Sequence, residues 1–480
     1  MIYSSSLALL TDLYELTMAY GYWKLGMMDR EAVFTLTFRR RPFDGSYAIC
    51  AGLETAIEFI ENFRFEPSDL SYLENLKTPS GDPLFEKGFL DYLAGFSFKG
   101  DLYAMPEGTP IFPYEPLLLV KGPLLGAQLL ESALLNIINF QTIIATKASR
   151  IAAAAEGDEV IEFGLRRAQG IDGALSGTRA AFIGGCLSTS NVFAGKQFDI
   201  PVKGTQAHSW IMAFKEEKEA FEAYTEVLPK NCLYLVDTYN SIEGTKNAIA
   251  VSKEKRTPML GVRLDSGDLA KLSIQIRKLL DDAGFKEAKI MASNELDEHI
   301  IRDLKKQGAK IDIWGVGTNL ITAKDQPALD GVYKLAAIQD EKGSWVYKVK
   351  ISEQLIKTTN PGILQTRRFY DKLGIAFADM MYDMEMGLSE GNKFIDPFDP
   401  TRSQKIGENY EYRDLLVPIF KRGTRVYISP PLTAIQKNTE KELETLCPTV
   451  RRFLYPDPYF VGFEKSIYDL KMNLIEDLKR

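Results

Sequence analysis

The first part of the chain combines segments with helical periodicity and several short segments with the patterns of strands. Apolar and aromatic positions recur at helical spacing over residues 11–22, where acidic side chains occupy the first turn, and again over residues 54–63. Side chains alternate in character over residues 32–40, which predicts a strand. Short runs separated by Pro and Gly fill residues 98–122 and predict antiparallel strands. This part therefore reads as an α+β domain.

A different pattern begins at Leu124. Leu, Ile and Ala recur at helical spacing and proline is absent from Leu124 to Ala155, which predicts one or two long buried helices. Short apolar runs then follow one another, the later ones at roughly 25–30-residue intervals, with helical patterns between most of them. The runs are Val160–Ile161, Ala180–Ile183, Val202, Leu233–Val236, Leu260–Leu264, Ile290–Ala292 and Ile311–Trp314. About seven such units favour an irregular parallel α/β barrel over an open sheet.

The alternation of strands and helices stops after Leu320. Residues 333–337 and 345–351 pair as a predicted hairpin that returns to the sheet of the first domain. Helical patterns over 438–446 and 466–478 end the chain. The predicted domains are an N-terminal sandwich domain (1–123), a barrel domain (124–330), a return to the sandwich (331–435) and a C-terminal helical extension (436–480).

Composition narrows the class of protein. Apolar residues make up 45% and charged residues 26% of the 480 positions, as in globular proteins. The net charge of -7 disfavours nucleic acid and anionic membranes as partners. The only dense basic run, Arg39–Arg41, is either a solvated strand end or part of a polyphosphate site across a subunit interface.

Cysteine spacing and apolar run lengths point to the cytoplasm. The four cysteines show no Cys-x-x-Cys spacing, so neither a zinc site nor a disulfide framework is predicted. The early apolar run, Leu7–Leu10, has no basic region before it, and no run approaches the ~18 residues typical of a membrane span.

Candidate chemistry gathers after the predicted strands, where parallel barrels place their sites. His208 follows a Gly204-Thr205 turn, and small neighbours leave room for an anion beside its imidazole, a side chain suited to nucleophilic or acid–base chemistry. The alternative for a single histidine is a buried, structural side chain. Arg166 and Arg263 follow two other strands and are suited to binding anions.

Glycine and hydroxyl groups follow the last two predicted strands. Ser293 comes directly after one, and Gly315, Gly317 and Thr318 come after the other, where backbone N–H groups and a hydroxyl can surround a phosphate. The alternative is a tight strand-to-helix turn. Asp265 is suited to binding ribose hydroxyls, or to holding magnesium through water, with helix capping as the structural alternative. No side chain is assigned as a direct metal ligand.

Five segments together resemble the nicotinate phosphoribosyltransferase family over nearly the whole chain. They are residues 11–23 (TDLYELTMAYGYW), 162–170 (EFGLRRAQG), 204–209 (GTQAHS), 261–268 (GVRLDSGD) and 315–319 (GVGTN). The resemblance implies the type II phosphoribosyltransferase fold, an irregular α/β barrel with a split sandwich domain, working as a homodimer with sites at the subunit interface. Residues 363–368 (ILQTRR) depart from the family pattern, and no site residue is placed there.

The resemblance also implies a reaction. Nicotinate and phosphoribosyl pyrophosphate would give nicotinate mononucleotide and pyrophosphate, with Mg²⁺ as cofactor and ATP as co-substrate, in a cytoplasmic enzyme of NAD salvage that is formally a carbon–nitrogen ligase. His208 would be the phosphorylated histidine. Tyr14, Thr205 and Arg263 would hold the pyridine acid, with Arg166 as a further substrate ligand, while Asp265 would act in catalysis. The phosphate ligands would be Ser293, Gly315, Gly317 and Thr318.

Other activities remain as alternatives. A nicotinamide-specific relative would need an acidic acceptor near the ring, and Gly204-Thr205-Gln206 provides none. A barrel isomerase or aldolase acting on a sugar phosphate would use the same phosphate loop, but would need a base or a Schiff-base lysine at a strand end, where none is well placed. A barrel that binds nucleotides without turnover would not need His208, Arg263 and Asp265 together.

Overall fold

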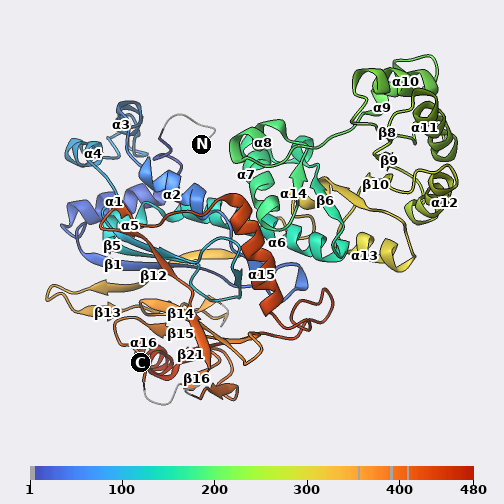
Figure 1. Ribbon diagram of the computed structural model, residues 1–480. Coiled ribbons are helices and arrows are strands. Elements are labelled where there is room, and N and C mark those ends of the chain that lie inside the picture. The colour runs from blue at the N-terminus through green and yellow to red at the C-terminus, as the bar shows by residue number, and fades with distance from the viewer. Residues whose placement is uncertain (1–5, 355–356, 390–392, 408–409, 480) are drawn as a thin grey trace. The chain divides into compact units, whose positions relative to one another are not determined.

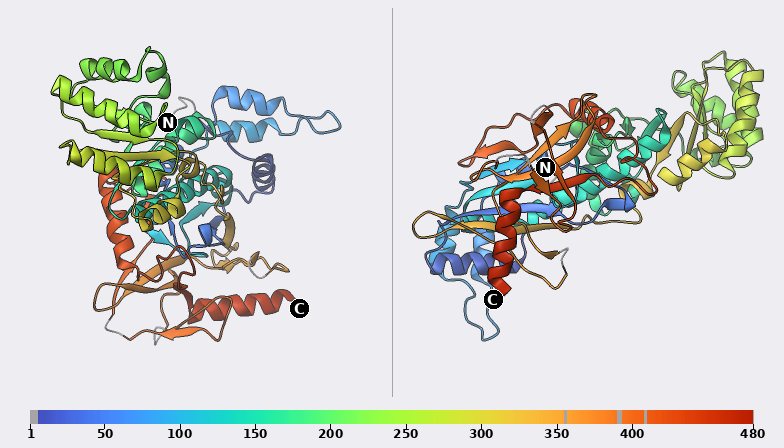
Figure 2. Two further views of the ribbon diagram at one scale, coloured as in Figure 1. Left: turned by 90° about the vertical axis from the view of Figure 1, so that its right-hand side faces the viewer. Right: turned by 90° about the horizontal axis from the view of Figure 1, so that it is seen from below.

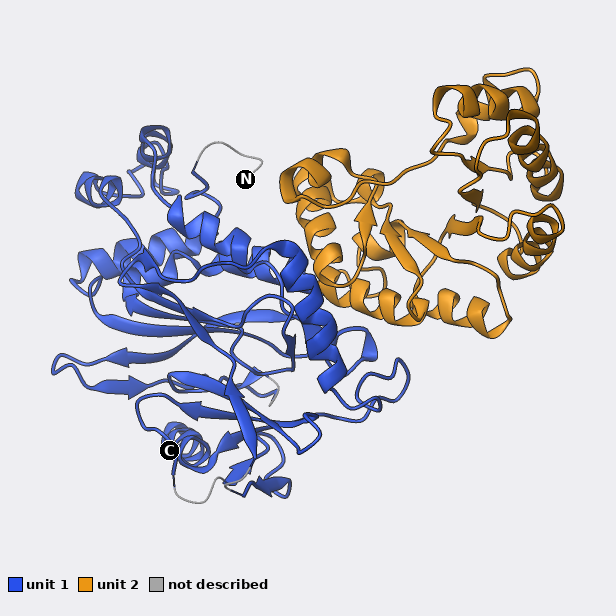
Figure 3. Cartoon of the chain, viewed as in Figure 1, with its two compact units in different colours: residues 1–143, 328–480 blue, residues 144–327 orange. Residues whose placement is uncertain are grey.

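The computed structural model describes residues 6–354, 357–389, 393–407 and 410–479 (Figure 1). It divides into two compact units, drawn in separate colours in Figure 3. Unit 1 contains residues 1–143 and 328–480, and unit 2 contains residues 144–327. The division falls inside one long helix at Ile143/Ile144, whereas the sequence pattern placed the domain boundary at residue 124.

Unit 1 contains an antiparallel sheet of seven strands in the order β13-β12-β1-β5-β3-β19-β20. In that order the strands are Trp345–Tyr347, Gly331–Gln339, Glu31–Phe38, Leu118–Pro123, Asp101–Ala104, Val417–Lys421 and Thr424–Arg425. The predicted hairpin is confirmed, because β12 pairs antiparallel with both β13 and β1. The sheet thus combines strands from residues 31–123 with strands from residues 331–425.

A second sheet in unit 1 has the order β17-β16-β21-β15-β14-β18. Its strands are Ser403–Lys405, Lys393–Ile395, Phe460–Glu464, Ala376–Asp383, Leu364–Tyr370 and Glu411–Asp414. A small ladder joins β2 (Ala48–Ile49) to β4 (Pro110–Ile111). Since β21 pairs with β15 and β16, residues 436–480 are not a purely helical extension but complete this sheet.

Helices cover both sheets of unit 1. The early helices are α1 Leu13–Lys24, α2 Leu53–Glu61, α3 Pro67–Glu74, α4 Lys87–Ala94 and α5 Leu124–Gln128, with the 3-10 turn η1 at Pro42–Asp44. The late ones are α15 Leu432–Thr445 and α16 Lys465–Lys479, the last coloured red beside the C-terminus in Figure 2. Helix α5 packs on β1 and β5, and Ile467 of α16 packs into the core of the second sheet.

Unit 2 is a parallel sheet of six strands in the order β7-β6-β11-β10-β9-β8. In that order they are Ser188–Thr189, Glu159–Glu162, Ile313–Val316, Lys289–Asn294, Gly261–Leu264 and Leu233–Leu235. The helices are α6 Glu131–Ala155, which begins in unit 1, α7 Gly170–Ile183, α8 Val192–Phe198, α9 His208–Met212, α10 Glu217–Val227, α11 Ser241–Lys255, α12 Leu269–Asp282, α13 Glu298–Lys306 and α14 Thr318–Ile321, with the 3-10 turn η2 at Leu165–Arg167. The predicted mixed α/β fold with a parallel sheet is confirmed.

Two of the predicted strands of unit 2 differ from the observed ones. Ala180–Ile183 is not a strand but the end of α7, and the strand that follows is β7. All four of these side chains are buried, and a short apolar run of this kind does not distinguish a buried helix from a buried strand. Val202 contributes only an isolated parallel bridge to Thr189.

The apolar stretch Leu124–Ala155 is long and apolar enough to cross a membrane by length and composition, and 67% of its most apolar window is buried inside the protein. It contains Lys147 and Arg150, which are buried in unit 2 and form ion pairs with the buried Glu298 at 2.7 and 2.8 Å. Charged side chains paired in this way are typical of a core helix.

Candidate active site

The candidate site of unit 2 lies where its parallel strands end. Parallel strands present their carboxyl ends at one edge of the sheet, so residues far apart in sequence come together there. Arg263 in β9, Ser293 in β10 and Gly315 in β11 are on neighbouring strands, and Ser293 is the register partner of Gly315. The parallel pairing of β9, β10 and β11 is therefore consistent with the prediction that these strand ends converge.

Arg263 makes the largest number of polar contacts in this group. Its Nη1 donates to the Thr205 hydroxyl at 3.0 Å and to the Gln206 carbonyl at 3.4 Å. Its Nε donates to Ser293 Oγ at 2.8 Å, and its Nη2 to Asp265 Oδ1 at 3.0 Å. These hydrogen bonds hold the guanidinium in one orientation. Only 15% of the Arg263 side chain is exposed, so the group is largely shielded from solvent. Such a fixed, planar donor suits a carboxylate ligand.

Asp265 carries a negative charge beside this guanidinium. Burial alone would raise its pKa, but the hydrogen bond from Ser293 and the charge of Arg263 outweigh burial and hold the pKa below its ordinary value. The Ser293 hydroxyl donates to Asp265 Oδ1 while accepting from Arg263. Ser293, predicted as a phosphate ligand, is thus already engaged with these two side chains.

His208 begins helix α9 and faces the carboxylate of Asp237. Its Nε2 lies 3.3 Å from Asp237 Oδ1, and 41% of its side chain is exposed against 1% for Asp237. The other oxygen, Asp237 Oδ2, accepts from the Asp265 backbone N–H at 2.8 Å and the Ser266 hydroxyl at 2.6 Å. His208 is therefore not a buried structural histidine. A buried acid connects it to the loop that carries Asp265.

The sequence analysis assigned no role to Asp237, which directly follows the predicted strand Leu233–Val236. Asp237 lies 29 residues from His208 along the chain, and no spacing rule links them. A carboxylate directly after an apolar strand run was the only available signal.

Phe163, directly after β6, is a second residue that sequence reasoning missed. Its ring centroid lies 5.5 Å from the guanidinium carbon of Arg263. A β-carbon on Gly315 would come within 2.8 Å of this ring, and one on Gly317 would come within 3.2 Å of the Phe163 carbonyl oxygen. The two glycines therefore make room for Phe163, and the sequence signal was an aromatic residue at a strand end within the 162–170 segment.

The buried carboxyl of Glu162 holds the turn that follows Phe163. It accepts hydrogen bonds from the Thr189 hydroxyl at 2.6 Å, the Thr178 hydroxyl at 3.0 Å and the backbone N–H of Gly164. Burial raises its pKa even though these donors act in the opposite direction. The end of β6 is thus fixed from within the sheet.

The predicted phosphate loop forms the end of β11 and the start of α14. Gly317 caps this four-residue helix, and Thr318 is its half-buried first residue. One strand earlier, Asn294 has a φ of 122°, an unusual conformation for a residue other than glycine. Strained backbone of this kind clusters at functional sites.

Two predicted site residues lie outside this network. Arg166 is exposed in the turn η2 after β6, and Tyr14 belongs to unit 1, on helix α1. Tyr14 is 45% exposed, and burial together with the neighbouring Glu131 raises its pKa to about 12, so its hydroxyl stays protonated at neutral pH. Among the described residues, no three acidic, histidine or cysteine side chains gather as a metal site.

A parallel α/β unit whose strand ends bring together a histidine–carboxylate pair, a fixed arginine and glycine-rich turns defines a class of enzymes that act on anionic substrates. Comparison with known proteins gives the family. The chain matches the sequence models described as the nicotinate phosphoribosyltransferase N-terminal domain over residues 9–139, the family itself over 159–380 and its C-terminal domain over 365–471. The chain belongs to the nicotinate phosphoribosyltransferase family.

Individual relatives agree. A nicotinate phosphoribosyltransferase of Bacillus subtilis (strain 168) is 46% identical, covering 99% of this chain and 96% of the relative. One from Homo sapiens is 31% identical, covering 97% and 96%. The crystal structure of human nicotinic acid phosphoribosyltransferase matches with a TM-score of 0.83 at 28% identity, covering 97% of this chain and 99% of that one.

Proposed function

We propose that the strand-end site of unit 2 transfers the phosphoribosyl group of phosphoribosyl pyrophosphate to nicotinate and couples this transfer to ATP hydrolysis through His208. The observation that carries the substrate assignment is Arg263, whose guanidinium is oriented by Thr205, Ser293 and Asp265. A planar carboxylate such as that of nicotinate would take its charged hydrogen bonds from this guanidinium and from the Thr205 hydroxyl. A neutral amide would gain much less from the same positive charge.

Phe163 would define the plane of the pyridine ring. Its ring lies beside Arg263, so a nicotinate whose carboxylate reaches the guanidinium would have its own ring next to this aromatic face. Stacking of this kind adds roughly 0.5–1.5 kcal/mol beyond simple burial.

In the transfer step, the nicotinate ring nitrogen forms a bond to C1 of the ribose while the bond from C1 to the pyrophosphate oxygen breaks. Positive charge develops on the sugar and negative charge on the leaving pyrophosphate. Asp265, anionic because its pKa is held low, would stabilise the sugar cation and bind a ribose hydroxyl. The turn at Gly315, Gly317 and Thr318 would hold a phosphate, with the exposed Arg166 as a further anion ligand.

In this proposal, Mg²⁺ binds together with the phosphorylated substrates of the enzyme. We assign Mg²⁺ to the polyphosphates of ATP and of phosphoribosyl pyrophosphate, where it neutralises charge, and not to a set of side chains.

The His208–Asp237 pair suggests which imidazole nitrogen accepts phosphate. If Nε2–H donates to Asp237 Oδ1, the lone pair is on Nδ1. Nδ1 would then attack the terminal phosphorus of ATP, and the bond to ADP would break. Later attack by water on the same phosphorus would break the N–P bond, release phosphate and return the imidazole.

Replacing Asp237 by asparagine tests this arrangement. The amide would donate to Nε2 and favour the tautomer with its proton on Nδ1, so ATPase activity is expected to fall about 100-fold, the upper range for loss of a partner that orients an imidazole. ATP-independent transfer should be much less affected. Ser266→Ala is the matched control, because it removes another hydrogen bond to the same carboxylate without facing His208. Equal ATPase losses in the two variants would contradict the assigned role.

A homodimer is part of the proposal. Helix α1 exposes Leu13, Tyr14 and Met18, a set of large apolar side chains available to a second copy of the chain. Tyr14 would then close the strand-end site of the partner subunit over the pyridine ring.

Mixing two variants that each lose ATP-coupled synthesis tests the role of Tyr14. In Tyr14→Ala mixed with His208→Ala, half of the dimers are mixed after random exchange, and each of these has one intact site if the two residues come from different chains. Activity should recover to about a quarter of the wild-type value. No recovery after demonstrated subunit exchange would place Tyr14 in the site of its own chain or outside the chemistry.

We also infer that the sheet of unit 2 closes as an irregular barrel. The segment Val202–Gln206 pairs with Thr189 at one edge of the sheet, while the Gln206 side chain accepts from the backbone N–H of Leu235 in β8, at the other edge, at 3.4 Å. The two sheets of unit 1 would correspond to the split sandwich domain. A cytoplasmic location accords with the four cysteines, all of which are free.

The product of the reaction provides the test of the proposed function. Purified protein incubated with nicotinate, phosphoribosyl pyrophosphate, ATP and Mg²⁺ should form nicotinate mononucleotide, identified by its mass. Absence of this product from folded protein would refute the assignment.

A further inference from the structure

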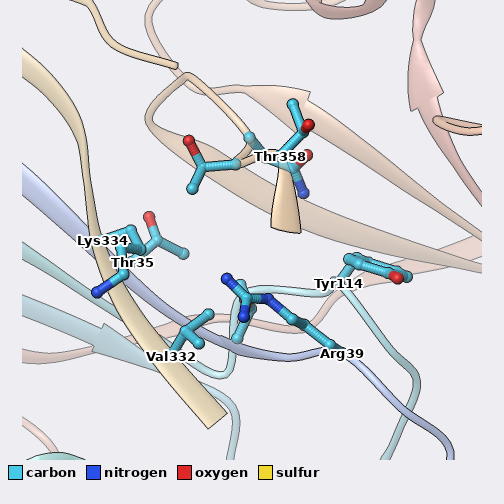
Figure 4. A pocket seen from close by; sticks show the side chains of 9 residues that line it. Thr35, Arg39, Tyr114, Val332, Lys334 and Thr358 are labelled. Carbon is cyan, nitrogen blue, oxygen red and sulfur yellow. The ribbon is translucent and has the colours of Figure 1, made fainter. Parts of the chain in front are cut away.

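Buried polar atoms without a hydrogen-bond partner indicate a missing contact, because an unpaired donor or acceptor inside a protein costs free energy. One such atom in unit 1 is the hydroxyl oxygen of Thr35. Thr35 lines the small pocket shown in Figure 4, whose volume of about 20 Å³ is enough for one water molecule. Water can therefore satisfy this hydroxyl, and no larger ligand is needed there.

Gln206 of unit 2 is a different case, because it belongs to the segment that forms the strand-end site. The residue is 6% exposed, and its side-chain nitrogen Nε2 has no hydrogen-bond partner among the described residues. It directly follows Thr205, whose hydroxyl contacts Arg263 at 3.0 Å. An unpaired, buried NH₂ donor thus lies in the segment that touches the proposed carboxylate ligand.

Strand β8 fixes the orientation of the Gln206 amide. The backbone N–H of Leu235 donates to Gln206 Oε1 at 3.4 Å. An N–H group can be satisfied only by the oxygen end of an amide, so the NH₂ end is the free one. Leu235 is also the register partner of Arg263 in the parallel ladder, so the amide lies at the level of Arg263 in the sheet.

The backbone of Gln206 contacts the same arginine. Its carbonyl accepts from Arg263 Nη1 at 3.4 Å and from the Thr205 hydroxyl at 3.3 Å. Gln206 is thus joined to the Arg263 side chain through its main chain, and to the strand next to Arg263 through its side chain. These contacts place the free NH₂ group beside the guanidinium.

The polar groups at this place are mostly donors. They are the guanidinium of Arg263, the Thr205 hydroxyl and the NH₂ group of Gln206. Asp265 Oδ1, the carboxylate oxygen bound to the guanidinium, also accepts from Ser293 and is already engaged. Both oxygens of a carboxylate accept hydrogen bonds, whereas an amide brings an NH₂ group that needs an acceptor of its own. A set of donors therefore favours an acid over the corresponding amide.

We infer that Gln206 is a specificity-determining residue of the strand-end site, whose NH₂ group donates to the carboxylate of nicotinate. The inference rests on the proposed role of Arg263 as the main ligand of that carboxylate. Nicotinamide in the same place would set its own NH₂ group against one of the protein donors, whichever way its amide turned. Gln206 thus adds to the preference for the acid.

Kinetics with nicotinate as substrate and nicotinamide as competing inhibitor tests the inference. Gln206→Met keeps the length of the side chain but removes its polar end, so kcat/KM for nicotinate should fall about ten- to a hundredfold, the range for losing a hydrogen bond to a charged group. The inhibition constant of nicotinamide and the KM for phosphoribosyl pyrophosphate should change little. Gln275→Met is the matched control, because it makes the same substitution at an exposed position of α12 and should behave as the wild type.

Gln206→Glu separates the NH₂ donor from the contact with β8. The variant keeps an oxygen that accepts from Leu235, and beside Arg263 the new carboxyl is expected to be ionised, so an acceptor replaces the donor. The preference for nicotinate over nicotinamide should therefore fall below that of Gln206→Met. A wild-type preference in Gln206→Glu, or weakening of both ligands by the same factor in Gln206→Met, would reduce Gln206 to a link between its segment and β8 and overturn the inference.

Arg263→Lys, measured in the same assay, separates this inference from the proposed function. A preference that falls in Arg263→Lys but not in Gln206→Met would contradict only the role of Gln206. A preference that is unchanged in Arg263→Lys would contradict the assignment of the carboxylate ligand itself, and the inference about Gln206 would fall with it.

Discussion

Replacing Arg263 by alanine should raise the KM for nicotinate by a factor of roughly thirty to several thousand. This range corresponds to about 2–5 kcal/mol, the cost of removing one partner of a desolvated, hydrogen-bonded charge pair. The Arg263 guanidinium contacts Thr205, Ser293 and Asp265. Its loss therefore also leaves Asp265 without this positively charged neighbour. Steady-state kinetics with nicotinate and nicotinamide provides the measurement, and the preference for the acid should collapse.

Arg263→Lys is the control for charge. Lysine keeps the positive charge but lacks the planar guanidinium with its several hydrogen-bond donors. The KM of the lysine variant for nicotinate should therefore lie between those of the wild type and the alanine variant. If Arg263→Ala keeps the wild-type KM for nicotinate, this arginine does not bind the carboxylate.

Replacing His208 by asparagine should abolish both the labelling of the protein by ATP and its ATPase activity. A phosphate on imidazole nitrogen is labile in acid and stable in base, so label from the terminal phosphate of ATP should leave the wild-type protein on acid treatment only. Slow ATP-independent synthesis should persist, because Arg263, Asp265 and the Gly315–Thr318 turn are unchanged.

His299 offers a control within the same chain. It is the only other histidine of the sequence, lies in α13 and is 46% exposed, so His299→Asn should be labelled as fully as the wild type. Acid-labile label that survives in His208→Asn but disappears in His299→Asn would move the phosphorylated position to His299.

The sequence predicted the strand-end residues because their arrangement follows from a repeating rule. Parallel strands that alternate with helices bring their carboxyl ends to one edge, so Thr205, Arg263 and Asp265 were expected together, and hydrogen bonds do join them. The rule failed at Ala180–Ile183, the end of helix α7. All four residues are buried there, so their apolar sequence looks the same as that of a buried strand.

Other features depend on contacts that no spacing reveals. The pairing of His208 with Asp237 joins two loops, and Phe163 is placed by the glycines of a different strand. The positive φ of Tyr114 and Tyr455 is likewise a property of the folded chain and not of the residue type. Periodicity predicts elements and the edge at which they end, whereas contacts between loops need coordinates.

The most direct test of the central claim is the release of pyrophosphate from phosphoribosyl pyrophosphate with nicotinate, nicotinamide or quinolinate, each with and without ATP. Release should be fastest with nicotinate, should increase when ATP is added and should be accompanied by ATP hydrolysis. Faster release with nicotinamide or quinolinate, or a nicotinate rate that is indifferent to ATP, would contradict the account of Arg263 as the carboxylate ligand or of His208 as the coupling residue.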